Sequence, residues 1–171
     1  MIFVDSCIYI RWLRDRADIF AELGDHLRRG DLATCGVVRA EVLRGIVSVP
    51  VRERMELLFS SMHEVAMVPE LWTDVAQLAW ALDRRGEVLP LTDIAIAACA
   101  QQAGATVITT DPHFAKIPGL KRSCSGRCVS KSTTCRLPLA RAVDAFAGYA
   151  RMSLTTWPWT SVRRNWRPWN L

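Results

Sequence analysis

The segment Ile94–Ala103 is apolar on every face except at Gln101 and Gln102. A helix with apolar side chains all round is normally covered on all sides, so this segment predicts a helix packed between layers of a domain rather than one on its surface. Gly104 follows directly, and glycine readily adopts the left-handed conformation that ends many helices. We therefore expect the helix to stop there.

A short buried strand is expected next. Ala105–Thr109 is rich in β-branched residues, and Pro112 lies three residues beyond it, where a strand cannot continue because proline donates no backbone hydrogen bond. A helix that leads into a short apolar strand is typical of α/β domains.

Three aspartates stand at the ends of these elements. Asp93 lies in the first turn of the apolar helix, where the positive end of the helix dipole favours its ionised form. Asp111 follows the strand, and Asp5 directly follows Ile2–Val4, a second β-prone run. Ligands of α/β sheets gather outside the carboxyl ends of the strands, so we expect these acids at one rim.

A fourth acid, Glu41, lies on a predicted helix over Gly36–Ile46. By helical spacing it shares a face with Val38 and other apolar side chains, an unusual place for a glutamate without a partner. Arg39 and Arg44 are close enough in sequence to pair with it or to face solvent.

Each of these carboxylates also has an ordinary structural explanation, as a cap, an ion pair, a first-turn acid or a turn residue before proline. Four together repel, because two unit charges ~4 Å apart cost ~4 kcal/mol at an effective dielectric near 20. Such a cluster needs protonation or a cation, and oxygen ligands favour Mg²⁺ or Mn²⁺. A water acidified by the metal can attack a phosphodiester, so the chemistry expected is phosphodiester hydrolysis.

Four segments, Val4–Ser6, Arg39–Gly45, Leu91–Ala97 and Thr109–Phe114, together resemble a PIN-domain ribonuclease, specifically the VapC-type toxin of a bacterial type II toxin–antitoxin pair. The resemblance covers about residues 1–120. It implies an α/β/α sandwich around a short parallel sheet, a homodimer, Mg²⁺- or Mn²⁺-dependent endonucleolytic cleavage of RNA, and neutralisation by a small antitoxin protein.

The resemblance also implies roles for individual residues. The acidic metal ligands and catalytic residues would be Asp5, Glu41, Asp93 and Asp111, with Asp111 the most replaceable. Polar positions beside the metal match Ser6 and Thr109 or Thr110, although each could instead cap a helix or bond to backbone. His113 could touch the substrate or simply be solvated.

Two other functions remain open from the sequence. A nuclease of the same fold could act on DNA or in RNA maturation instead of as a toxin. The chain could also be a catalytically silent module that binds RNA or protein, although the intact acidic set disfavours this.

The net charge of +5 is unevenly distributed. Residues 1–121 hold 13 Lys+Arg and 16 Asp+Glu, whereas residues 122–171 hold 9 and 1. We therefore predict a nuclease domain over 1–121 and an atypical, basic, Trp-rich C-terminal extension over 122–171. The extension is either an RNA-binding segment or the product of a shifted reading frame near Lys121, and the abrupt loss of acids where the family pattern stops favours the shift.

No apolar run approaches the roughly 20 residues of a membrane helix, and Asp5 interrupts the apolar start too early for a signal peptide. We expect a cytoplasmic protein without a membrane partner, whose six cysteines are free thiols.

The remaining elements follow from apolar periodicity. We expect helices over 7–14 (capped by Ser6), 17–29, 51–64 and 71–85, and strands over 32–35 and 65–68. His26 and His63 are expected on helix surfaces.

Overall fold

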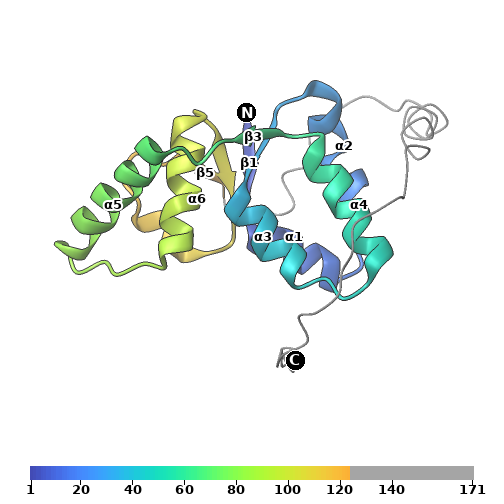
Figure 1. Cartoon of the computed structure of the whole chain (residues 1–171), viewed down its shortest axis with the longest axis horizontal. Helices are drawn as coiled ribbons and strands as arrows, with labels where there is room; N and C mark the ends of the chain where they lie inside the picture. The colour runs from blue at the N-terminus through green and yellow to red at the C-terminus, as the bar shows by residue number, and fades with distance from the viewer. Residues whose placement is uncertain (124–171) are drawn as a thin grey trace. The chain divides into compact units, whose positions relative to one another are not determined.

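The computed structural model describes residues 1–123, which include a five-stranded parallel sheet with strand order β3-β2-β1-β4-β5 (Figure 1). The strands are β1 (Ile2–Val4), β2 (Leu32–Cys35), β3 (His63–Val65), β4 (Thr106–Ile108) and β5 (Arg122–Ser123). Apart from Arg122 and Ser123, the basic Trp-rich extension predicted over 122–171 lies outside the described residues.

Six α-helices flank this sheet within residues 1–123, which form an α/β fold, as the sequence predicted. Helices α5 and α6 lie on one side, and α1, α2 and α4 lie on the other (Figure 1). Helix α3 packs against both α1 and α6. The helices are α1 (Ser6–Arg14), α2 (Ile19–Arg29), α3 (Gly36–Arg44), α4 (Val49–Ser60), α5 (Pro69–Asp83) and α6 (Leu91–Gln102), and a short 3-10 helix, η1 (Pro112–Lys116), follows β4.

Helix α6 is covered on all sides, as its composition predicted. Every residue from Ile94 to Ala100 is buried, and the helix ends at Gln102, just before Gly104, whose φ is +60°. Its first turn contains Asp93. The helix therefore fixes this acid at the edge of a rigid core.

The register of the sheet brings two strand ends together. Val4, the last residue of β1, is paired with Ile108, the last residue of β4, and the backbone N–H of Asp5 donates to the Ile108 carbonyl at 3.0 Å. Asp5 and the chain after Ile108 consequently leave the sheet at the same edge.

Helix α1 starts one residue earlier than predicted. Ser6 is its first residue and Asp5 takes the N-cap position, where its side chain accepts no hydrogen bond from the first turn of the helix. The prediction that Ser6 caps this helix was therefore wrong. Its hydroxyl lies 3.4 Å from Asp5 Oδ1 instead.

The region between α4 and α5 also differs from the prediction. Helix α4 ends at Ser60, where the Ser61 hydroxyl donates to the Leu58 carbonyl, and β3 comes earlier than the predicted strand over 65–68. The short polar run of β3 becomes a strand because it pairs with β2, an interaction between distant segments that local periodicity does not report. His63 therefore lies on a strand.

None of the helices within residues 1–123 is long and apolar enough to cross a membrane.

Candidate active site

Asp5 is the most buried acid of the predicted set, with 3% of its surface exposed. A buried carboxylate requires hydrogen-bond donors, because it has lost its hydration. The Thr109 hydroxyl donates to Asp5 Oδ2 at 2.7 Å, and the Ser6 hydroxyl approaches Oδ1. Both side chains thus surround the carboxylate that follows β1.

Thr109 also connects Asp5 to the loop after β4. Its hydroxyl oxygen accepts a hydrogen bond from the Asp111 backbone N–H at 2.9 Å, while the hydroxyl donates to Asp5. Only 1% of Thr109 is exposed. One buried hydroxyl therefore sets the position of two acidic residues.

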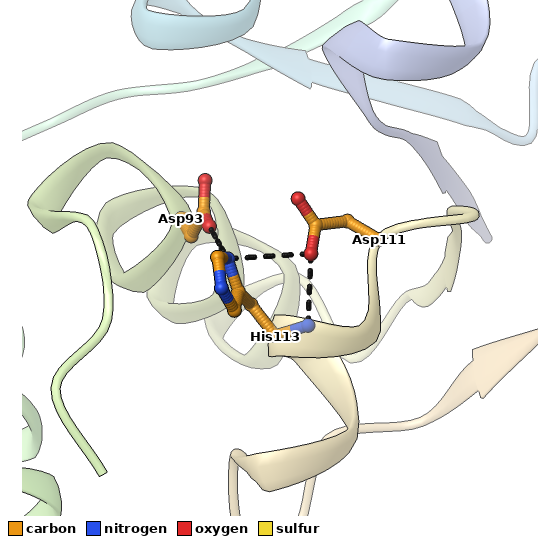
Figure 2. A group of neighbouring side chains, drawn as sticks. All are labelled: Asp93, Asp111 and His113. Atoms are coloured by element: carbon orange, nitrogen blue, oxygen red, sulfur yellow. Dashed lines mark hydrogen bonds and ion pairs between the residues drawn. The ribbon is translucent and has the colours of Figure 1, made fainter.

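Asp93 and Asp111 meet at His113 (Figure 2). The His113 Nδ1 atom lies 2.9 Å from Asp93 Oδ2 and 3.3 Å from Asp111 Oδ1. Asp111 Oδ1 also accepts the backbone N–H of His113 at 2.8 Å, which caps η1. One ligand atom from each residue lies within 4.8 Å of those of the other two, so the three side chains could hold a metal ion.

The pKa of Asp93 is raised from its ordinary value. Burial of the carboxyl raises it most, the hydrogen bond with His113 lowers it, and the negative charges of Asp111 and Asp5 raise it further. The net direction is opposite to that expected from the helix dipole alone. Contacts through Thr109 and His113 link Asp5, Asp111 and Asp93, so each of these carboxylates lies within the electrostatic influence of another.

Glu41 lies on α3, which begins at the carboxyl end of β2, and it is not in the group formed by Asp93, Asp111 and His113. Its side chain is half-buried. A hydrogen bond with Cys99 lowers the pKa of the thiol of Cys35, the last residue of β2. The negative charge of Glu41 opposes this lowering. Arg39, one of its two predicted partners, pairs with Glu64 on β3.

The two candidate threonines have different surroundings. Both hydroxyls lie near the Cys7 thiol, at 3.6 Å for Thr109 and 3.5 Å for the exposed Thr110, but it is Thr109 that donates to Asp5. Burial, the charge of Asp5 and a hydrogen bond with Asp5 raise the pKa of Cys7. The Cys7 thiol is half-buried beside the site, and in the sequence only its position two residues after Asp5 indicates this.

The sequence profile of the PIN domain matches residues 2–120. The chain therefore belongs to the PIN-domain family. No curated protein sequence matches it.

Solved structures with a similar fold include the following three. One is VapBC2 from Rickettsia felis, bound to a DNA fragment from its promoter. Its sequence is 19% identical to this one, the TM-score is 0.61, and the match covers 72% of this chain and 98% of that chain. VapBC-1 from nontypeable Haemophilus influenzae is 23% identical with a TM-score of 0.57, over 72% and 97%. A toxin–antitoxin complex from Klebsiella pneumoniae is 24% identical with a TM-score of 0.52, over 70% and 95%.

Proposed function

We propose that this protein is a metal-dependent endoribonuclease that acts as the toxin of a toxin–antitoxin pair. The observation that carries the proposal is the meeting of Asp5, Asp93 and Asp111 at one edge of the sheet, where the two neighbouring charges help to raise the pKa of Asp93. A site that concentrates negative charge in this way is suited to a divalent cation.

The donors fit such a cation. Carboxylate oxygens of Asp5, Asp93 and Asp111 would hold Mg²⁺ or Mn²⁺, with Glu41 completing the set from α3. When bound, the ion supplies acidification of a water nucleophile and stabilisation of the charge on the leaving oxygen.

The protein's own residues position and expose this site. Thr109 and Ser6 hold the Asp5 carboxylate, and the rigid α6 fixes Asp93. Thr110 is exposed and the His113 side chain is 37% exposed, so the rim beside the acids is open to solvent. An open rim suits an extended single strand better than a small molecule enclosed in a pocket.

The proposed biological role rests on the similar structures, which carry the VapBC name or are described as a toxin–antitoxin complex. We therefore propose a small antitoxin protein as partner and a homodimer as the assembly. Light scattering on the purified chain should give about twice the chain mass of 19.2 kDa.

Cleavage of a mixed RNA pool by the full chain tests the enzymatic proposal. We expect cleavage with Mg²⁺ or Mn²⁺ and none with EDTA, and loss of at least about a hundredfold in rate for Asp5→Asn and Asp93→Asn, because each removes a charged ligand. Asp74→Asn makes the same charge change at an exposed position of α5 and should cleave normally. Activity that persists in EDTA or in both site variants would contradict the proposal.

The same assay on single-stranded and duplex DNA separates an RNA nuclease from a DNA nuclease of this fold. Induced expression in a bacterial host tests the toxin role. We expect the wild-type chain to arrest growth, Asp5→Asn to be harmless, and growth to resume when the product of an adjacent small gene is co-expressed. If cells that express the wild-type chain grow normally although the purified chain cleaves RNA, the toxin role is contradicted and the nuclease activity stands.

A further inference from the structure

The donor group at Asp93 and Asp111 contains a nitrogen atom. The sequence led us to expect oxygen ligands alone, but the imidazole of His113 points between the two carboxylates (Figure 2). We propose that His113 is itself a metal ligand, through Nδ1, and that this nitrogen makes the site select Mn²⁺ over Mg²⁺. The inference rests on the proposed function, because it assumes that a divalent cation binds at this rim.

The two distances from His113 Nδ1 to the carboxylate oxygens fit adjacent ligands in a coordination shell. Ligand atoms about 2.1 Å from an octahedral ion lie about 3.0 Å apart when adjacent and about 4.2 Å apart when opposite. Nδ1 of His113 lies 2.9 Å from Asp93 Oδ2 and 3.3 Å from Asp111 Oδ1. The longest separation within the group stays below 4.8 Å. Small side-chain rotations would therefore suffice to bind an ion.

The backbone around His113 holds the imidazole in this place. Its own N–H is bonded to Asp111, and the next residue, Phe114, is anchored in the core with 1% of its surface exposed. At the end of η1, Lys116 pairs with Glu87 at 2.7 Å, which ties this turn to the loop that precedes α6. Asp93 and His113 are thus held on two segments that are joined to each other.

Nitrogen changes the preference of the site among metals. Imidazole suits first-row transition ions, whereas Mg²⁺ strongly prefers oxygen and keeps much of its water shell. Manganese accepts both carboxylate and imidazole, and the site offers both. A neutral ring with its proton on Nε2 leaves the Nδ1 lone pair available for the ion.

An alternative explanation uses the same distances. Nδ1–H could donate to the carboxylates as an ordinary hydrogen bond, with no part in metal binding. A measurement of the metal itself, rather than of catalysis, separates the two.

Electron spin echo spectroscopy of Mn²⁺ bound to the full chain detects directly coordinated nitrogen. We expect ¹⁴N coupling in the wild type and its loss in His113→Gln, which replaces the nitrogen with an amide oxygen. Calorimetric titration should show Mn²⁺ affinity falling about tenfold in His113→Gln, the scale of a lost ligand contact, with Mg²⁺ affinity changing less than about threefold.

His63→Gln provides the matched control, since His63 is exposed on β3 at the far edge of the sheet. Its spectrum and affinities should equal those of the wild type. Thermal unfolding of all three proteins without metal checks that His113→Gln folds, and His113→Ala serves as a second variant with no donor.

Two other outcomes are distinguishable. Binding of Mn²⁺ that Asp93→Asn abolishes, but with no nitrogen coupling and an unchanged Mn²⁺ to Mg²⁺ ratio in His113→Gln, would overturn the inference and leave the metal-dependent nuclease intact. Absence of binding by either ion to the wild type would overturn both.

Discussion

The side chain of Thr109 joins Asp5 and Asp111, and its removal should damage the site more than its small size suggests. In Thr109→Val, the buried Asp5 carboxylate loses its 2.7 Å donor and the Asp111 N–H loses its acceptor. Loss of buried partners of this kind costs about 1–3 kcal/mol. We expect the free energy of unfolding, measured in urea, to fall by this amount and cleavage to fall at least about tenfold, because Asp5, a proposed metal ligand, is no longer held.

Two variants make this prediction specific. Thr109→Ser keeps the hydroxyl and should retain most of the activity. Thr110→Val removes the neighbouring hydroxyl, which contacts Cys7 rather than an aspartate, and should leave cleavage within about threefold of the wild type. Equal losses in Thr109→Val and Thr110→Val would show that the hydrogen bond to Asp5 has no special role.

At the scale of single residues, the sequence indicated which acids matter but not which side chains hydrogen-bond to them. Asp5, Asp93 and Asp111 were identifiable because each stands at the end of a recognisable element. The choice between Thr109 and Thr110 depends on which hydroxyl turns towards β1, a contact across 104 residues. The position of His113 likewise depends on how η1 turns after β4, so local sequence could not distinguish a solvated histidine from one between two carboxylates.

Among the secondary-structure elements, α2 and β2 are joined by a small polar network. His26, which the sequence placed on a helix surface, is buried, and its Nδ1 lies 2.8 Å from Asp31 Oδ1. Arg29 donates to the other oxygen of Asp31. Burial alone would raise the pKa of Asp31, but the hydrogen bonds with His26 and Arg29 and their charges outweigh it and lower that pKa.

This shift has a definite sign. An acid whose pKa is lower in the folded state stabilises the fold above its unfolded pKa, and the contribution disappears as the pH falls through the folded pKa. We expect Asp31→Asn to lower the free energy of unfolding by about 0.5–1 kcal/mol at pH 7, a value reduced by the partial exposure of the pair. The difference from the wild type should shrink steadily below about pH 4, near the unfolded pKa.

Urea unfolding from pH 7 to pH 2.5 measures this difference. Asp74→Asn, an exposed acid on α5, should show little difference at any pH. If the difference in the free energy of unfolding between wild type and Asp31→Asn widened towards low pH, the lowered pKa of Asp31 would be contradicted.

Elements with a strong local signal were predictable, and those that depend on pairing were not. Helix α6 follows from its apolar composition, and its C-terminus from Gly104. By contrast, β3 carries two exposed residues out of three, and β5 is two residues long. Both are strands because a neighbour supplies hydrogen bonds, so their sequences hold little information about them.

At the scale of the whole molecule, the sheet continues past the end of the family profile. The predicted boundary at residue 121 lies just before β5, and the family profile ends at residue 120. The backbone N–H groups of Val107 and Thr109 donate to the carbonyls of Lys121 and Ser123, at 2.8 and 3.2 Å. Residues past the profile therefore support the strand that leads into the site.

Two shortened chains test the contribution of this edge and of the extension. A chain ending at Leu120 loses both carbonyls and leaves two N–H groups in the sheet without these acceptors, so we expect it to unfold at least about 2 kcal/mol more easily than one ending at Ser123. Because Thr109 is one of the two donors, its cleavage activity should fall as well.

The chain ending at Ser123 isolates the remaining 48 residues of the extension. If these residues take no part in cleavage or in RNA binding, this chain should match the full chain in cleavage and in affinity for RNA. If they are a basic, aromatic RNA-binding segment, its affinity for single-stranded RNA should fall several-fold, and the loss should diminish at high salt because phosphate contacts are screened. Measurement of RNA binding by both chains at two salt concentrations therefore shows whether the extension binds RNA, and translation of the gene in its other frames tests the shifted frame.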